Sequence, residues 1–276
     1  MPESPEVQAL VEFLDERATG RVIRDVDVLE FRAIKTPAAP PSVLIGRTIT
    51  GAARHGKHVA LTVDDAHLVV SLGRHGWVRW RSSADGTRPS GTGPPALAGF
   101  GLDGGEAFEA TDAGSWVSLG LFVVDDVMAV PGIARLGPDP AADGFTRSTF
   151  EAALGGRRKQ VKAILQEQES LAGIGNAYSD EILHEARISP VTHASALGDD
   201  ARARLYDATV CTVREAIDAR RGIPIDMLKA AKVATMRVHG RGGGACPVCG
   251  DTIRDFTFAG TSAQYCPTCQ TAGAEL

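Results

Sequence analysis

The pattern of apolar residues changes near the middle of the chain, and this change limits the possible folds. Up to residue 129 the sequence consists of short β-rich runs such as "KHVALTV" and "HLVVSLG", separated by Gly, Asp-Asp and Asp-Gly. That rhythm is typical of an antiparallel sandwich or barrel. From residue 147 the apolar residues recur at helical spacing. The segment between them, "VPGIARLGPDPAADGFT", is rich in Pro, Gly and Asp, so we place a domain boundary there.

A helix precedes the strands. Val7, Leu10, Val11 and Leu14 have the spacing of an amphipathic helix, which Gly20 ends. With 43% hydrophobic residues in 276, the chain is long enough to bury a sizeable core in more than one domain. The sequence therefore predicts an α+β, multidomain protein with an N-terminal helix, an antiparallel β-sandwich and a helical part.

The first residues, "MPESPEV", raise a separate question. They hold two acids and no apolar run, and no stretch of the chain has the length of a membrane span, so we expect no leader and a soluble, cytoplasmic protein. Ser4 can cap the first helix and Pro5 suits its first position. Neither role explains Pro2 or Glu3.

The net charge of −5 argues against a protein that coats nucleic acid through bulk charge. Residues 135–243 are more basic, with 16 Lys and Arg against 14 Asp and Glu. Two local runs are candidate nucleic-acid patches: "RHGKH" at 54–58, and the four basic residues of "RRKQVK" at 157–162. The alternative for either run is an ordinary solvated surface.

The cysteines near the C-terminus have the spacing of a metal site. Cys246 and Cys249 form one C-x-x-C, Cys266 and Cys269 form another, and sixteen residues separate the two motifs. This interval suits a four-cysteine zinc site, and the segment is too small to fold on a core of its own. A redox pair is the alternative. Four thiolates leave no open position on the ion, so the zinc would be structural. Cys211 has an apolar helical spacing and is expected in the core.

A glycine-rich turn interrupts the helical part. In "AGIGNAYSDEI", Gly173, Gly175 and Asn176 come directly before a predicted helix. Backbone amides at a helix N-terminus can receive an anion such as a phosphate, and glycines allow it to approach closely. A plain glycine-rich linker between helices is the alternative.

Three features of the chain coincide with those of one family. They are Pro2-Glu3 at the N-terminus, "ESLAGIGNAYSDEILHEARISP" in the helical part, and "VHGRGGGACPVCG…YCPTCQ" near the C-terminus. Together they closely resemble the formamidopyrimidine-DNA glycosylase and endonuclease VIII family of base-excision repair enzymes. The resemblance covers the chain nearly end to end and in the same order.

The resemblance implies a layout and a partner. Members of the family hold damaged DNA in a cleft between their domains. We therefore expect a monomer that binds damaged DNA and no membrane, associated with the nucleoid of a bacterium, with one structural Zn²⁺. The implied segments are a catalytic β-sandwich at 1–131, a hinge at 132–146, a helix-two-turns-helix DNA-binding domain at 147–235 and a zinc hairpin at 236–276.

The resemblance also gives Pro2 and Glu3 a role. Once Met1 is removed, the secondary amine of Pro2 would attack C1′ of a damaged nucleotide, expel the base and hold the sugar as an iminium ion. Glu3 would move protons as general acid and base, and elimination would then cleave the strand. Lys57 would bind a phosphate beside the lesion, and Asn176 would do the same from the glycine-rich turn. The activity implied is that of a DNA glycosylase with abasic-site lyase activity.

The chain departs from the family in the parts that open the duplex. The hairpin stretch "FAGTSAQYC" lacks the arginine that clamps phosphates, for which Arg254 is a possible substitute. "SLGRHG" replaces "HLGMSG", which places Arg74 where the family has the Met that fills the hole left by the flipped base. "TDAGSWVS" replaces "TDPRRFG", so Gly114 takes the place of the family's wedge arginine and Trp116 takes the place of its Phe.

These departures define the expected substrate and the alternatives. Arg74, His75 and Trp116 would fill the gap left in the base stack in a different way from the family's side chains. Alternatively, the substrate would be one whose duplex needs little opening. We expect lesions other than 8-oxoguanine to be preferred. One alternative is a lesion-binding or abasic-site-binding protein that has lost turnover. A second is an unrelated zinc-ribbon module, which would leave Pro2 and Glu3 unexplained.

Overall fold

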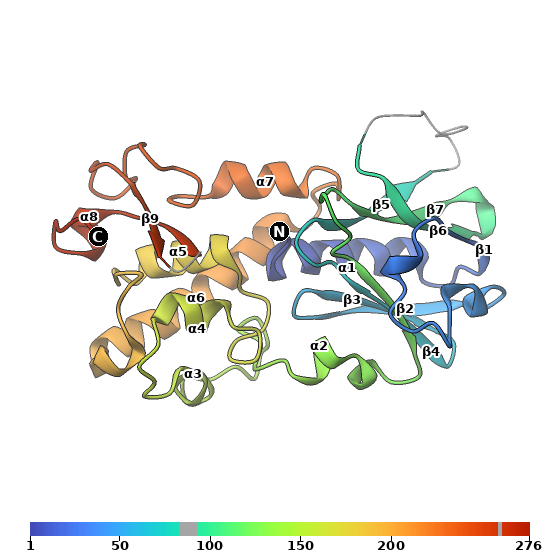
Figure 1. Ribbon diagram of the computed structural model, residues 1–276, viewed down its shortest axis with the longest axis horizontal. Helices are drawn as coiled ribbons and strands as arrows, with labels where there is room; N and C mark the ends of the chain where they lie inside the picture. Colours follow the sequence, from blue (N-terminus) through green and yellow to red (C-terminus); the bar gives the residue numbers. More distant parts are fainter. Residues whose placement is uncertain (83–92, 259–260) are drawn as a thin grey trace. The chain divides into compact units, whose positions relative to one another are not determined.

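The computed structural model describes residues 1–82, 93–258 and 261–276, and they form two compact units (Figure 1). Unit 1 comprises Met1–Pro2, Glu6–Arg135 and Arg221–Met227, and unit 2 comprises Glu3–Pro5, Leu136–Arg220 and Leu228–Leu276. The stretch "SSADGTRPSGTGPP" at 82–95 is rich in Ser, Gly and Pro, which predicts a loop. Its residues 83–92, and residues 259–260 of the expected hairpin, lie outside the described residues.

Within the described residues, unit 1 holds two four-stranded antiparallel sheets and the helices α1 and α2, which confirms the predicted sandwich. The sheet orders are β1-β6-β7-β5 and β2-β3-β4-β8. The bounds are α1 Ser4–Ala18, β1 Ile23–Val28, β2 Ile49–His55, β3 His58–Val63, β4 Ala66–Ser71, β5 Gly76–Arg81, β6 Ala96–Leu102, β7 Ala107–Asp112, β8 Gly120–Val124 and α2 Pro131–Ala134.

Helix α1 contacts one strand of each sheet. Its Asp15 carboxylate accepts a hydrogen bond from the amide of Ala52 in β2 at 2.8 Å, and its Phe13 ring packs edge-on against Trp80 of β5. The four apolar positions that predicted the helix are all buried. β2 and β5 are each the last strand of a sheet, so α1 contacts an edge strand of both sheets, and Asp15 binds one backbone amide on the open side of β2.

Unit 2 is mostly helical, and a β-hairpin and the short helix α8 follow its main helices. Its core combines residues of the helices with the loop residues between them, including Phe145, Leu171 and Ile174. The bounds are α3 Arg147–Leu154, α4 Val161–Gln166, α5 Asn176–Glu185, α6 Asp199–Arg220, α7 Leu228–Thr235, β9 Arg254–Phe258, β10 Thr261–Tyr265 and α8 Pro267–Gln270. Among the described residues, short 3₁₀ helices occupy Phe31–Ala33, Pro41–Leu44, Asp103–Gly105 and Val127–Ala129 in unit 1, and Ala194–Ala196 in unit 2.

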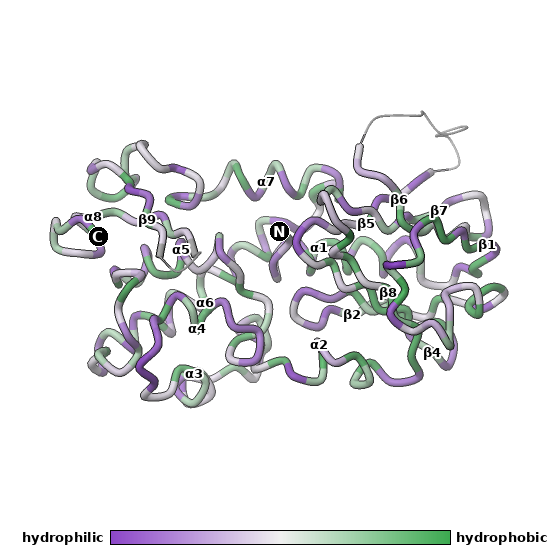
Figure 2. The backbone as a smooth tube through the Cα atoms, viewed as in Figure 1, coloured by the Kyte–Doolittle hydropathy of each residue, from purple (hydrophilic) through white to green (hydrophobic). Residues whose placement is uncertain are grey.

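Each of the two units includes a short segment that is separate in sequence from its main part. The chain passes from unit 1 to unit 2 after Arg135, inside the predicted hinge. Glu3–Pro5 group with unit 2 and Arg221–Met227 return to unit 1, and the sequence pattern signalled neither exchange. Among the described residues no helix is long and apolar enough to cross a membrane. The first basic run, at 54–58, covers the turn between β2 and β3 and the adjoining strand ends, and this part of the chain is strongly hydrophilic (Figure 2).

Two expectations about single residues are wrong. Cys211 is exposed on α6, two residues beyond buried Thr209 and therefore about 200° around the helix from it. Its thiol donates to the Glu215 carboxylate, and that hydrogen bond, with some burial, raises the thiol pKa to about 11. Lys162, placed in a basic surface patch, is 3% exposed and pairs with Asp180.

Candidate active site and zinc centre

The glycine-rich turn and the first turn of α5 bind the carboxylate of Glu3. The amides of Gly175 and Tyr178 donate to Oε2 at 2.5 and 3.4 Å, and the amide of Ala177 donates to Oε1 at 3.1 Å. Glu3 is 2% exposed. The anion at this helix start is therefore a side chain of the protein itself, where the sequence had suggested a phosphate.

The two glycines of the turn have different reasons to be glycine. Gly173 has φ +85°, a conformation that disfavours a side chain, and its carbonyl accepts the amide of Ser4 at 3.0 Å. Gly175 has an extended backbone, but a Cβ there would lie 2.7 Å from Cδ of Glu3. Position 175 therefore requires glycine because a side chain would occupy the space of the Glu3 carboxylate, and not because of its backbone angles.

A lysine that the sequence reasoning missed completes this site. The Nζ atom of Lys232 on α7 lies 3.0 Å from Oε1 of Glu3 and 4.8 Å from the centroid of the Tyr178 ring. The Glu3 and Lys232 side chains are 2% and 11% exposed. No motif marks Lys232, because the two partners are 229 positions apart in the chain.

Asn176, expected to bind phosphate, joins three elements of unit 2. Its Oδ1 atom accepts a hydrogen bond from Gln166 of α4 at 3.0 Å, and its Nδ2 atom donates to Oγ of Ser262 in β10 at 3.3 Å. The side chain is partly exposed. Its position at the start of α5 therefore depends on the hairpin as well as on the helices.

The remaining catalytic candidates belong to unit 1. Pro2 is partly exposed and directly precedes Glu3. Lys57 is half-buried in the two-residue turn between β2 and β3, where Gly56 has φ +56°. The next residue, His58, has its pKa lowered to about 4 by burial and by the nearby charges of His55 and Lys57, so it is neutral at pH 7.

Arg74 and Trp116 lie on two loops of unit 1 that one serine ties together. The amides of Arg74 and His75 donate to Oγ of Ser118 at 3.1 and 3.2 Å, and Ser118 lies on the loop that carries Trp116. Arg74 and His75 are exposed, and Trp116 is 66% exposed. The structure thus brings together the loops that differ from the family pattern.

Asp112 anchors the loop that carries Trp116. It accepts hydrogen bonds from the amides of Gly114, Ser118 and Leu119 and from the Ser118 hydroxyl, all at 2.8–2.9 Å. Burial opposes its ionisation, but these hydrogen bonds outweigh burial and lower its pKa. The loop is therefore fixed at its base, while the indole at its tip faces solvent.

The second basic run is largely engaged in ion pairs. Arg157 and Lys159 each contact the carboxylate of Glu167, at 2.9 and 2.8 Å. Lys162 lies 2.5 Å from Asp180, whose other oxygen lies 2.7 Å from Nδ1 of His239. Burial lowers the pKa of Lys162, while Asp180 opposes that shift. Three of the four basic residues of this run are therefore engaged in ion pairs within unit 2, while Arg158 is exposed.

The four cysteines near the C-terminus form the metal centre. The sulfur atoms of Cys246, Cys249, Cys266 and Cys269 all lie within 4.8 Å of one another. A tetrahedral Zn²⁺ with Zn–S bonds of about 2.3 Å needs sulfur atoms about 3.8 Å apart, and this cluster fits it. The residues hold one structural zinc ion, as predicted, and leave no position for a catalytic water.

Hydrogen bonds join the zinc centre to the helix that binds Glu3. Nε2 of His184, on α5, lies 3.3 Å from Sγ of Cys246. Gln270, in the second cysteine knuckle, accepts the amide of Cys266 and donates to the carbonyl of Ile188, each at 2.9 Å. The hairpin is therefore attached to α5 and to the residues that follow it.

Arg254 lies at the wrong end of the hairpin to replace the missing arginine. It pairs with Tyr265, next to Cys266, and its guanidinium contacts Glu275 at 2.8 Å. Arg254 is the first residue of β9, which runs four residues further to Phe258. We therefore do not assign Arg254 the clamping role considered from the sequence.

Comparison with known proteins places this site in a family. Models of the formamidopyrimidine-DNA glycosylase N-terminal domain, its H2TH domain and the zinc finger found in FPG and IleRS match residues 1–113, 136–226 and 243–272. A formamidopyrimidine-DNA glycosylase of Heliobacterium modesticaldum is 34% identical over 98% of this chain and 100% of its own length.

Solved structures agree over the same length. The MutM (Fpg) protein of Thermus thermophilus has a TM-score of 0.82 and 28% identity, covering 98% of this chain and 99% of its own. Lactococcus lactis formamidopyrimidine-DNA glycosylase, bound non-covalently to DNA with an AP site, has a TM-score of 0.84 and 25% identity, with 97% and 99% covered. The chain belongs to the formamidopyrimidine-DNA glycosylase family. It is a DNA glycosylase of the class in which abasic-site lyase activity is typical.

Proposed function

We propose that this protein removes damaged bases from DNA and cleaves the strand at the resulting abasic site, with Pro2 as nucleophile and Glu3 as proton-transfer group. The observation that carries the proposal is the burial of the Glu3 carboxylate against α5, one residue after Pro2. A carboxylate fixed by backbone donors, rather than left in solvent, suits general acid-base work. The Lactococcus lactis relative bound to an AP site supports damaged DNA as the partner.

The reaction begins on the amine that Met1 leaves behind. The Pro2 nitrogen forms a bond to C1′ of the damaged nucleotide, and the base departs with a proton. Opening of the sugar ring gives an iminium ion between Pro2 and C1′. This cation acidifies the proton on C2′, so its removal expels the 3′ phosphate and cleaves the strand. Water then releases the sugar fragment from Pro2.

Exposed and polar side chains other than Pro2 and Glu3 would hold the DNA. Lys57 and Asn176 would contact phosphates, which positions the strand without reading its sequence. Arg74 and Trp116, on the two loops tied by Ser118, would fill the space left when a nucleotide leaves the stack. Trp stacks on bases and Arg adds charge, whereas the family pattern uses Met, Arg and Phe at these places.

The altered loops predict an altered lesion preference. We expect damaged pyrimidines, abasic sites, single-stranded lesions or bulky adducts to be processed faster than 8-oxoguanine, because the duplex-opening side chains differ at Arg74, Gly114 and Trp116. Single-turnover excision rates on matched duplexes measure this. A clear preference for 8-oxoguanine opposite cytosine would contradict it.

Borohydride trapping on abasic DNA tests the proposed function. Reduction of the iminium converts it to a stable amine, so the protein becomes covalently attached to the DNA through Pro2. Mass spectrometry of the same sample reports whether Met1 has been removed, which the mechanism requires. Binding of abasic DNA without any covalent product, in protein that lacks Met1, would indicate the alternative of a lesion-binding protein without turnover.

A further inference from the structure

The carboxylate of Glu3 is bound by four donors in unit 2. Three of them are backbone amides of the glycine-rich turn and α5, and the fourth is the ammonium of Lys232 on α7. A carboxylate that accepts from donors on both oxygens is held in its ionised form, since a protonated oxygen would face another hydrogen. Of these four donors, Lys232 is the one on a side chain and the one with a full charge.

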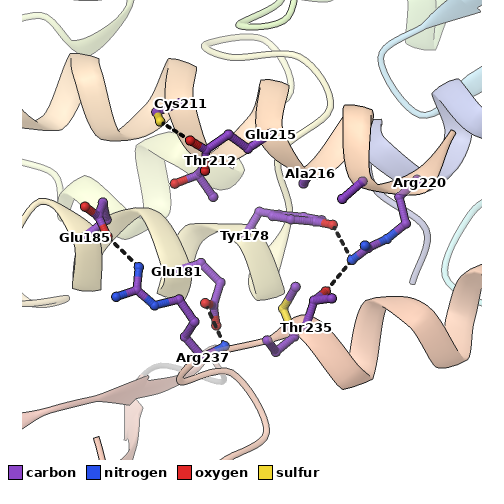
Figure 3. A pocket seen from close by; sticks show the side chains of 12 residues that line it. Tyr178, Glu181, Glu185, Cys211, Thr212, Glu215, Ala216, Arg220, Thr235 and Arg237 are labelled. Atoms are coloured by element: carbon purple, nitrogen blue, oxygen red, sulfur yellow. Dashed lines mark hydrogen bonds and ion pairs between the residues drawn. The ribbon is translucent and has the colours of Figure 1, made fainter. Parts of the chain in front are cut away.

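The position of Lys232 is itself fixed by packing around α7. Buried Arg220, at the end of α6, donates to the hydroxyl of Tyr178 at 3.5 Å and to Oγ1 of Thr235 at 2.5 Å (Figure 3). Thr235 lies on α7, three residues after Lys232, and Tyr178 presents its ring to the Lys232 ammonium. Arg220 therefore ties α5, α6 and α7 together around the lysine.

A pocket lies beside this cluster, and its acidic side chains on α5 have partners other than Lys232. Its volume is about 350 Å³, and Figure 3 shows its acidic side chains on α5 and α6. Glu185 pairs with Arg237, and Glu181 accepts backbone amides from residues 237–239. These acids are thus occupied within the fold, and Lys232 is not among the lining residues.

We propose that Lys232 is a positioning residue for Glu3: it orients the carboxylate and keeps it ionised, so that Glu3 begins each turnover as a proton acceptor. This inference rests on the proposed function. The other charges near Glu3 do not replace Lys232. Lys162 on α4 faces Glu3 but is paired with Asp180 at 2.5 Å.

The test compares Lys232→Met, which keeps the stem and removes the charge, with Lys232→Arg, which keeps the charge. Lys229→Met, at an exposed position of the same helix, is the matched control. For Lys232→Met we expect base excision to slow by about tenfold to hundredfold and the acid limb of its pH–rate profile to move to higher pH. We expect Lys232→Arg to restore most of the rate, and Lys229→Met to behave as wild type.

DNA affinity and its salt dependence separate positioning from phosphate binding. Unchanged affinity and salt slope in Lys232→Met, with a shifted pH profile, support the proposal. A loss confined to affinity, with a shallower salt slope, would assign Lys232 to a phosphate and overturn it, as would a wild-type rate and profile. Thermal melting checks that each variant folds. Wild-type protein that gives no trapped product refutes the proposed function instead, whatever Lys232→Met does.

Discussion

Glu3→Gln is expected to slow base excision by about 10²–10⁴-fold, the range that general acid-base groups contribute. The amide of Gln cannot take or give a proton at neutral pH. It also presents an NH₂ group to a site where four donors face the carboxylate, so at least one hydrogen bond is replaced by a clash between hydrogens. Single-turnover excision on a lesion-containing duplex measures the effect.

Two further variants show whether this loss is chemical. Glu16→Gln removes the same charge from an exposed position of α1 and should leave the rate unchanged. Pro2→Gly keeps an α-amine, so trapping on abasic DNA should survive at a reduced rate, whereas an additional residue before Pro2 should abolish it. A Glu3→Gln enzyme with the wild-type excision rate would remove Glu3 from the mechanism.

Much of the fold could be predicted because its signals are local. The β-rich runs of β3 and β4, the spacing of Val7 to Leu14 in α1 and the two C-x-x-C motifs each lie within a short stretch of sequence. The predictions of a sandwich, an N-terminal helix and a zinc hairpin needed no long-range information. Cys211 shows the limit, since an apolar neighbourhood in a helix does not say on which side of the buried stripe a residue falls.

The site could be predicted only in part because its contacts are long-range. The glycine-rich turn indicates an anion at the start of α5, but the anion is Glu3, which lies 172 positions earlier in the chain than Gly175. Lys232 reaches the same carboxylate from a helix with no motif. Arg74 and Trp116 were singled out separately, and Ser118 is what joins their loops. Such pairings depend on chain topology, which residue spacing does not encode.

Loss of zinc is expected to unfold the hairpin segment and to weaken DNA binding. The segment buries few apolar residues of its own, among them Val238 and Ile253, and two of its cysteines complete that core. For domains of this kind the metal contributes about 10–16 kcal/mol at pH 7, which is effectively their folding free energy. We therefore expect Cys266→Ser to lose zinc and hydrogen-exchange protection in residues 236–276.

The effect of zinc loss should spread to α5. Without the hairpin, Asn176 loses its hydrogen bond to Ser262, and His184 and Ile188 lose their contacts with the cysteine knuckles. DNA affinity should fall with zinc content when a chelator is titrated. Cys211→Ser is the matched control, because that thiol is exposed on α6 and contacts Glu215 instead of the metal cluster. A Cys266→Ser protein with a full equivalent of zinc and a protected hairpin would refute the four-cysteine centre, and equal losses in Cys211→Ser would refute its specificity.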